Sequence, residues 1–216
     1  MSNGINSFYN KFSICYDFLI TLLAFFAGGE KKYRNKIVDL AEIQKGERIL
    51  DLCCGTGTLT KLISQRLNNS GMVIGIDYSD EMIELAREKS KDIPNIKYNI
   101  SDGRNLPFKN LSFDKVFICM ALHEMLAEHR KMVIGEMYRV LKNDGVGIFI
   151  EFDQPEKPCL RYKLIIKIEE FWDKEALEDF KKTNLQKELK EAGFIITKTE
   201  LTLGNCIRIM VARKRF

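Results

Sequence analysis

The sequence predicts an α/β fold: a mostly parallel sheet, covered by helices on both faces and closed by one antiparallel strand. Two patterns predict it. Short apolar runs alternate with segments of helical periodicity between residues 47 and 152, which indicates a parallel sheet with crossover helices. Near the end of the chain, two β-rich runs are separated only by Gly204 and Asn205, which predicts a terminal hairpin.

Each strand and helix of the alternating part, residues 47 to 152, is supported by its own sequence pattern. Its strands are nearly continuous apolar runs, as expected when helices cover both faces of a sheet. The expected strands are Glu47–Cys53, Met72–Asp77, Asn95–Ile100, Phe113–Met120 and Val146–Phe152. The expected helices between them are Thr58–Leu67, Asp80–Lys89 and Glu128–Leu141. Ser79 is a suitable N-cap for the second helix, and Asn143, Asp144 and Gly145 predict a turn before the fifth strand.

Other elements lie outside this repeat. A charged helix is expected before it, at Glu30–Ile43. Helices at Cys159–Trp172, Lys174–Lys182 and Asn184–Ala192 are expected after it. The hairpin strands are Phe194–Leu203 and Cys206–Arg213. We therefore expect one domain overall, with an N-terminal helical lid over residues 1–45 and a ligand-binding core over residues 46–216.

Composition narrows the class of protein. A chain of 216 residues can bury a substantial core, and a net charge of +4 is too mild to predict nucleic-acid binding. Six cysteines form no C-x-x-C pair, which favours reduced thiols in an intracellular, cytoplasmic protein. The two histidines, His123 and His129, are six residues apart and do not share a helix face, so no metal site is expected.

The run Phe18–Ala27 contains Thr21 as its only polar residue. Ten residues are too few to span a bilayer. Three interpretations remain: a helix that covers the ligand site or core, a contact with a membrane surface, or a processed leader. Just before it, aromatic residues that include Tyr9 and Tyr16 recur at helical spacing, which fits either packing or contact with a ligand.

A glycine turn joins the first strand to its helix, with Gly55 and Gly57 separated by one residue. Binders of nicotinamide, flavin and S-adenosylmethionine all use such a turn. Asp77 ends the second strand, where a carboxylate can accept hydrogen bonds from ribose hydroxyls, although it could instead only cap the next helix. Asp102 follows the third strand, where it can accept from an adenine amino group. Thr60 replaces the third glycine that a pyrophosphate site requires, which favours S-adenosylmethionine.

Five segments, ILDLCCGTGTLT, VIGIDYSDEMIELAREK, SDGRNLPF, SFDKVFICMALHEM and EMYRVLKNDGVGIFIEF, resemble the ordered motifs of class I S-adenosylmethionine-dependent methyltransferases. The likeness is greatest to the branch that includes the C-methyltransferases of ubiquinone and menaquinone biosynthesis. It is specific between residues 47 and 152 and looser elsewhere. The resemblance implies a Rossmann-like seven-stranded sheet with an antiparallel last strand, S-adenosyl-L-methionine as donor, and a small-molecule substrate.

The resemblance also implies roles for individual residues. Gly55 and Gly57 would face the methionine and ribose parts of the donor, with Asp51 and the carbonyl of Cys53 near its amino-acid end. Asp77 would hold the ribose. The residues implied at the adenine are Tyr78, Met82, Asp102 and Gly103. Cys119 and Met120 would line the donor near its sulfonium, and Tyr9 and Tyr16 could touch its carboxylate end.

His123 is the candidate catalytic residue, because it follows the fourth strand and an imidazole suits a general base. A histidine in the pocket wall is the alternative. Glu151 and Asp153 are weaker candidates. The run Ala121–Glu124 stands where the quinone branch carries a Gly-Leu-Arg-Asn-like run, so the sequence leaves the acceptor open beyond a small, lipophilic or aromatic molecule. The competing functions are a non-catalytic methyltransferase-like binding protein and, more distantly, an NAD-dependent oxidoreductase.

Overall fold

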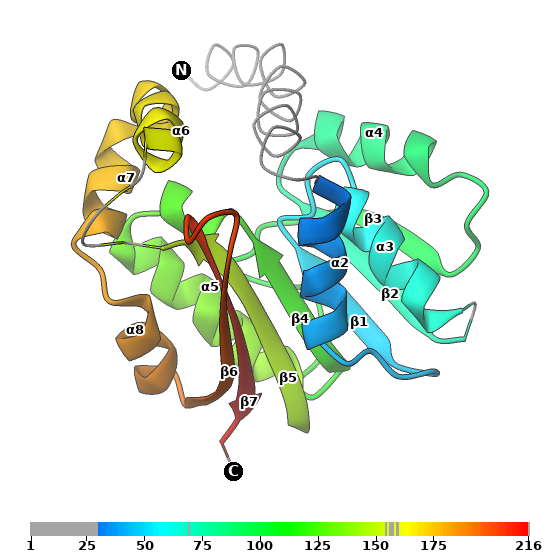
Figure 1. The fold of residues 1–216 in the computed structure, drawn as a ribbon. Coiled ribbons are helices and arrows are strands. Elements are labelled where there is room, and N and C mark those ends of the chain that lie inside the picture. The colour runs from blue at the N-terminus through cyan, green and yellow to red at the C-terminus, as the bar shows by residue number, and fades with distance from the viewer. Residues whose placement is uncertain (1–29, 69, 154, 156–157, 159, 216) are drawn as a thin grey trace, which may run out of the picture.

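The computed structural model contains one seven-stranded sheet with strand order β3-β2-β1-β4-β5-β7-β6 (Figure 1). It describes residues 30–68, 70–153, 155, 158 and 160–215. The strands are β1 (Arg48–Leu52), β2 (Met72–Asp77), β3 (Ile96–Ile100), β4 (Phe113–Cys119), β5 (Leu141–Phe152), β6 (Phe194–Thr202) and β7 (Ile207–Lys214). The pairs among β1 to β5 are parallel, and β7 runs antiparallel to both β5 and β6. The predicted sheet and its terminal hairpin are confirmed.

Helices cover both faces of this sheet. They are α2 (Glu30–Leu40), α3 (Thr58–Leu67), α4 (Asp80–Lys89), α5 (Ala127–Val140), α6 (Leu160–Trp172), α7 (Lys174–Lys181) and α8 (Leu185–Glu191), with a short 3-10 turn, η1 (Leu122–Glu124). One apolar core cluster joins α2 and α3 to the sheet, and a second joins α5 to α8 to it. Each strand in the centre is therefore buried on both sides, which explains the unbroken apolar runs in the sequence.

Most predicted boundaries hold to within two residues, and α3, β2 and α4 match their predicted ranges. Ser79 caps α4 as expected, because its side chain accepts a hydrogen bond from the backbone N–H of Met82. The predicted turn at residues 143–145 is wrong in one respect. Strand β5 already begins at Leu141, which pairs with Phe113, and the next pair joins Lys115 to Val146. The extra residues form an irregularity inside the strand, because the parallel ladder resumes beyond it.

The strand order creates a crevice at the carboxyl ends of β1 and β4. These neighbours lie at the point where consecutive connections go to opposite sides, which is the usual ligand site of an open α/β sheet. Both strands end in strained backbone: Cys53 follows β1 with φ of 55°, and Met120 follows β4 with φ of 54°. Non-glycine residues adopt this left-handed conformation rarely, and it often marks a functional site.

Arg130, a fully buried cation on α5, ties the C-terminal helices to this end of the sheet. Its guanidinium donates to both carboxylate oxygens of Glu188 at 2.8 and 3.0 Å and to Asp179 at 3.1 Å. It also donates to the carbonyl of Met125 at 2.7 Å, directly after η1. Because one side chain holds α7, α8 and the end of η1 together, the position of η1 is fixed.

Two sequence predictions fall partly outside the described residues. Of the expected lid over residues 1–45, the structure describes residues 30–45, which include α2. Residues 1–29, with Tyr9, Tyr16 and Phe18–Ala27, lie outside the described residues. The division into a lid and a core stays a prediction. No helix in the described part of the chain is long and apolar enough to cross a bilayer.

Candidate functional site

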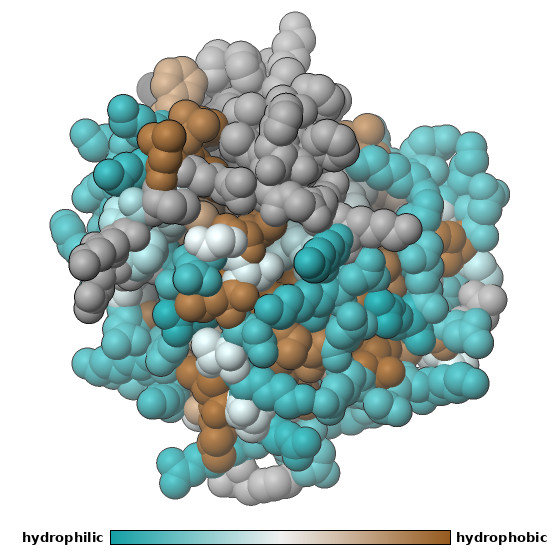
Figure 2. Space-filling model, in the orientation of Figure 1, coloured by the Kyte–Doolittle hydropathy of each residue, from teal (hydrophilic) through white to brown (hydrophobic). Residues whose placement is uncertain are grey.

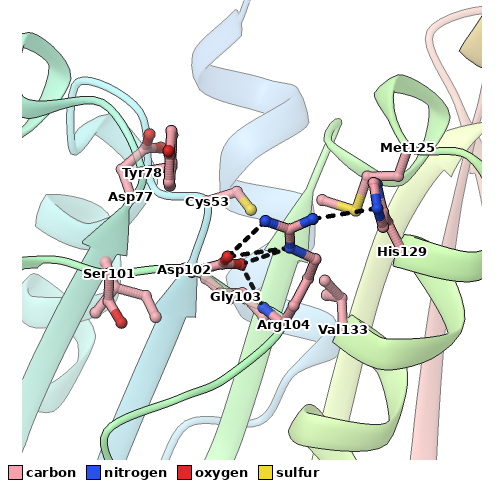
Figure 3. Close-up of a pocket in the computed structure, with 12 residues that line it drawn as sticks. Cys53, Asp77, Tyr78, Ser101, Asp102, Gly103, Arg104, Met125, His129 and Val133 are labelled. Carbon is pink, nitrogen blue, oxygen red and sulfur yellow. Dashed lines mark hydrogen bonds and ion pairs between the residues drawn. The ribbon is translucent and has the colours of Figure 1, made fainter. Parts of the chain in front are cut away.

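A pocket opens at the carboxyl ends of β1, β2 and β3 and is bounded on its other side by α5 (Figure 3). Most of the polar residues that line it come from the loops after these strands. The lining residues are Leu52, Cys53, Ile76, Asp77, Tyr78, Ser101, Asp102, Gly103, Arg104, Met125, His129 and Val133. The pocket thus brings together Cys53, Asp77, Tyr78, Asp102 and Gly103, five of the residues that the sequence assigns to donor binding.

The two glycines of the turn serve different purposes. Gly55 has φ of 52°, and a Cβ built on it would meet no heavy atom of the described residues within 4 Å, so these residues leave space beside it for a ligand. Gly57 has φ of 75°, and a Cβ there would lie 2.4 Å from the hydroxyl of Tyr98. Gly57 is therefore required by close packing against β3, whereas Gly55 leaves room at the site.

Asp77 organises the glycine turn from the end of β2. One carboxylate oxygen accepts from the backbone N–H of Gly55 at 2.8 Å, and the other accepts from the N–H of Ser79 at 3.0 Å. The same side chain lines the pocket. Asp77 thus supports the start of α4 and also presents a carboxylate to the cavity, and its role at the ribose stays a prediction.

Asp102 is held by Arg104, two residues further along. The guanidinium donates to Oδ1 at 3.0 Å and to Oδ2 at 2.7 Å, and the backbone N–H of Arg104 adds a bond of 2.8 Å to Oδ1. Arg104 also lies 3.1 Å from Nε2 of His129 on α5, so it bridges the pocket from one side to the other (Figure 3). The hydrogen bonds from Arg104 hold the pKa of Asp102 below its usual value.

Other predicted residues lie around the pocket without lining it. Asp51 is 1% exposed and accepts a hydrogen bond of 2.6 Å from the hydroxyl of Thr60. Burial raises the pKa of Asp51 to about 7. Cys119 lies 3.7 Å from the hydroxyl of Tyr33 on α2, and burial raises the pKa of its thiol to about 11. Met82 and Met120 are half-buried beside this region.

A buried cluster of ionisable groups lies at the ends of β4 and β5. Nδ1 of His123 is 2.6 Å from Oε1 of Glu151, and both side chains are 1% exposed. Nε2 of His123 has no hydrogen-bond partner among the described residues and points toward Oε2 of Glu169 at 3.6 Å and Oε1 of Glu124 at 4.0 Å. Glu169 on α6 is buried, whereas 49% of the Glu124 side chain is exposed. Glu124 is thus the member of the cluster that reaches the surface.

The acids determine the charge of His123. Burial alone would lower its pKa, but Glu151, Glu169 and Glu124 raise it well above its usual value. Desolvation by the surrounding protein raises the pKa of Glu124 to about 7; the charge on His123 opposes this rise, and those on Glu169 and Glu151 add to it. The arrangement can therefore exchange a proton near neutral pH.

Three side chains of this cluster could also hold a cation. One ligand atom from each of His123, Glu124 and Glu169 lies within 4.8 Å of the others. The spacing of the two histidines was the only sequence evidence against a metal site. It took no account of the two acids, because Glu124 comes from η1 and Glu169 from the distant α6. The expectation of no metal stays a prediction.

Comparison with known proteins agrees with this geometry. The model of the ubiE/COQ5 methyltransferase family matches residues 2–171. The chain belongs to this family. A demethylmenaquinone methyltransferase from Staphylococcus aureus (strain JH9) is 31% identical over 208 residues, covering 88% of this chain and 85% of the relative. The protein is thus an S-adenosylmethionine-dependent methyltransferase related to the quinone methyltransferases, as its motifs predicted.

Solved structures share the fold of this methyltransferase. A SAM-dependent methyltransferase from Aquifex aeolicus superposes with a TM-score of 0.66 at 19% identity, over 83% of this chain and 88% of that one. The 4+2 cyclase SpnF superposes with a TM-score of 0.71 at 17% identity, over 100% and 96%. Because a cyclase shares this fold, the fold alone does not determine the reaction, which depends on the residues of the site.

Sequence reasoning missed several residues of the methyltransferase site. The pocket is also lined by Arg104, Met125 and His129, which lie in loops and on a helix face. They were missed because none of them directly follows a predicted strand. Glu169 looks in the sequence like one of many helix acids. The only signal for it was its position among apolar residues, in the run Ile165–Phe171.

Proposed function

We propose that this methyltransferase transfers a methyl group from S-adenosylmethionine to a small lipophilic acceptor with an acidic ring hydroxyl, of the kind found in a quinol. Its relatedness to a demethylmenaquinone methyltransferase supports the acceptor class. The cluster around His123 supports the chemistry, because such an acceptor must lose a proton. Membrane contact through Phe18–Ala27 is a further part of this proposal and concerns residues outside the described ones.

The donor is assigned to the pocket at β1, β2 and β3. Asp77 would accept from the ribose hydroxyls, since its carboxylate already faces the cavity between two backbone N–H groups. Tyr78, a residue that is 72% exposed, would pack against the adenine together with Met82. Asp102 and Gly103 would meet the adenine edge, with Arg104 fixing the carboxylate. The open space beside Gly55 fits the chain that leads to the sulfonium.

The remaining predicted residues extend this path toward β4. Cys53 and Met120, both in left-handed backbone, stand at the adjoining ends of β1 and β4. Cys119 would line the site near the reacting methyl group. Asp51, which accepts a hydrogen bond from Thr60, would lie near the amino-acid end of the donor. Tyr9 and Tyr16 keep their proposed contact with the carboxylate end of the donor.

The bound donor supplies a methyl group already activated on a sulfonium. The protein has to align the acceptor and remove its proton. In our proposal Glu124 takes the proton from the ring hydroxyl, because it combines exposure with a pKa of about 7. His123 stabilises the charged form of Glu124 and is itself held by Glu151. An electron-rich ring carbon then forms the new bond to the methyl group as the bond from sulfur to that group breaks. The same carbon loses its hydrogen as a proton, which returns to the ring oxygen and restores the hydroxyl, so that the proton released overall is the one on Glu124.

The observation that carries this proposal is the close pair of His123 and Glu151 directly behind an exposed carboxylate, at the end of the sheet where the donor pocket opens. The test is methyl transfer from labelled S-adenosylmethionine to a short-chain demethylmenaquinol, with products identified by mass spectrometry. A ring-methylated product that requires Glu124 supports the proposal. Transfer only to amines or thiols, or undiminished transfer by the Glu124→Gln variant, would contradict it.

A further inference from the structure

Helix α6 presents two different faces. Its inner face carries Ile165, Ile166 and Glu169, all buried, and Glu169 reaches to within 3.6 Å of His123. Its outer face carries large apolar side chains that are partly or mostly exposed: Leu160 is 84% exposed, Leu164 is 50% exposed and Phe171 is 79% exposed. The helix thus stands between the proposed reaction centre and an exposed apolar surface.

The exposed side chains form one ridge. At about 100° per residue, Leu160, Leu164 and Phe171 fall within about 40° of one another around the helix axis. By the same spacing, Glu169 lies about 180° from Leu160. Figure 2 shows apolar side chains gathered over α6 at the upper left of the view. Isolated exposed leucines need no explanation, but three large apolar residues along one line of a helix do.

Basic residues border this ridge. Lys163 and Lys167 are both exposed and lie within about 60° of Leu160 on the same side of the helix. The nearest acid on that side, Glu170, is paired with Lys181 at 2.7 Å, so its charge is compensated. The outer face of α6 therefore combines an apolar ridge with positive charge that is not paired with an acid in the described part of the chain, which is the pattern of a helix that lies in the interface of an anionic membrane.

We propose that the outer face of α6, formed by Leu160, Lys163, Leu164, Lys167 and Phe171, docks on a lipid surface that carries anionic headgroups. The inference deepens the proposed function and rests on it for the reason to dock: a lipophilic acceptor dissolves in the bilayer. The apolar ridge enters the headgroup region and the lysines meet lipid phosphates. The inner face of the same helix then holds Glu169 against His123, one helix diameter from the lipid.

The test is co-sedimentation of the full chain with vesicles of phosphatidylcholine, with and without phosphatidylglycerol. We expect binding to the anionic vesicles that weakens with salt. Leu164→Glu combined with Phe171→Glu should weaken it at least tenfold, and Lys163→Glu combined with Lys167→Glu should abolish the preference for anionic lipid. Met132→Glu, at a residue of α5 that is 47% exposed, is the matched control and should bind as the parent does.

Two results would overturn the docking proposal. One is equal vesicle binding by the α6 variants and the parent, which would place membrane contact elsewhere in the chain. The other is a dimer in lipid-free solution that the Leu164→Glu and Phe171→Glu pair dissociates, which would make the ridge a protein interface.

A second measurement separates this proposal from the proposed function. The α6 variants should methylate a short-chain, water-soluble acceptor at the parent rate and lose activity only on acceptor embedded in vesicles. If no quinol is methylated in either form while vesicle binding follows α6, the proposed acceptor is wrong and the docking surface stands.

Discussion

Nδ1 of His123 lies 2.6 Å from Oε1 of Glu151, and neither side chain reaches solvent. The carboxylate of Glu151 also accepts from three backbone N–H groups, those of Leu122, His123 and Phe152, at 2.9, 3.2 and 2.8 Å. Glu151 therefore locks both the η1 turn and the ring that the turn carries. With Nδ1 donating to Glu151, Nε2 is directed toward Glu124 and Glu169.

Replacing Glu151 by Gln keeps the volume of the side chain and removes its charge. We expect kcat to fall about 100-fold or more, the lower end of the range for lost acid–base assistance, while donor affinity stays unchanged. A quenched assay with labelled donor measures kcat, and calorimetry with S-adenosylhomocysteine measures the affinity of the donor site. Asp153→Asn is the control, because Asp153 lies two residues further along and is engaged by Arg208 at 2.7 Å. An equal loss of turnover in both variants would show that the effect is general disruption of this strand end.

Glu124 should set the pH dependence of the rate. Its pKa of about 7 requires kcat to rise with pH through neutrality, because only the ionised form accepts a proton. The groups that act on it are His123 on the same turn, Glu151 on β5, Glu169 on α6 and Asp77 on β2. Glu124→Gln should remove the rising limb and lower kcat. A profile with the same limb in that variant would assign the titration to another group.

The glycine turn offers a matched pair of substitutions. Gly57→Ala forces a side chain into left-handed backbone and against Tyr98, and should lower the free energy of unfolding by about 2–4 kcal/mol. Gly55→Ala meets no neighbour and should cost only about 1 kcal/mol from its backbone conformation. We expect Gly55→Ala instead to weaken donor binding at least tenfold. Chemical denaturation and calorimetry distinguish the two, and equal effects on both quantities would contradict separate roles.

Asp77→Ala should weaken binding of S-adenosylhomocysteine by about 1.5–3 kcal/mol, the scale of hydrogen bonds to a charged group. The variant also loses the acceptor for Gly55 and Ser79, so its stability has to be measured in parallel. Asp114→Asn is a suitable control at the opposite end of the sheet, where Asp114 accepts from the N–H of Arg48 at 2.8 Å. Unchanged affinity in a folded Asp77→Ala variant would reject the ribose role.

Asp51 should make the free protein less stable as pH rises. Burial raises its pKa to about 7 in the folded state, above the value of 3.8 expected in the unfolded chain. Below about pH 4 the group is neutral in both states; between pH 4 and 7 only the unfolded chain releases the proton, so stability falls. Asp51→Asn should remove that fall, a gain of about 2–4 kcal/mol at pH 8 relative to pH 4. Parallel pH curves for both proteins would count against it.

The sequence predicted the fold well wherever a strong local pattern coincided with the tertiary arrangement. Helix α4 is an example: Ser79 caps it, and its buried residues Ile83 and Ala86 fit the helical period. The early start of β5 was missed because Asn143, Asp144 and Gly145 favour a turn locally, whereas pairing with β4 continues on both sides of them. Tertiary hydrogen bonding overrode the local preference there.

The site was predictable at strand ends and not elsewhere. Asp77 ends β2 and Asp102 lies just after β3, so the parallel sheet brings them to one edge without further information. Arg104, His129 and Glu169 depend on how a loop and two helices pack, which no spacing in the sequence encodes. His123 was found by its position after β4, but its two buried acids come from β5 and α6, 28 and 46 residues away.

The groups proposed to bind the donor and those proposed to act on the acceptor come mostly from different halves of the chain, which matters for how the protein evolved. Most of the groups proposed to hold the donor come from the first half of the chain, before residue 105; Cys119 and Met120, at the end of β4, are the exceptions. The proton-exchanging cluster and the α6 ridge come from the second half, after residue 119. A lineage can therefore exchange one acceptor for another through changes confined to the second half, while selection keeps the glycine turn intact. The superposition on a cyclase shows that this fold also occurs in a protein with a different reaction.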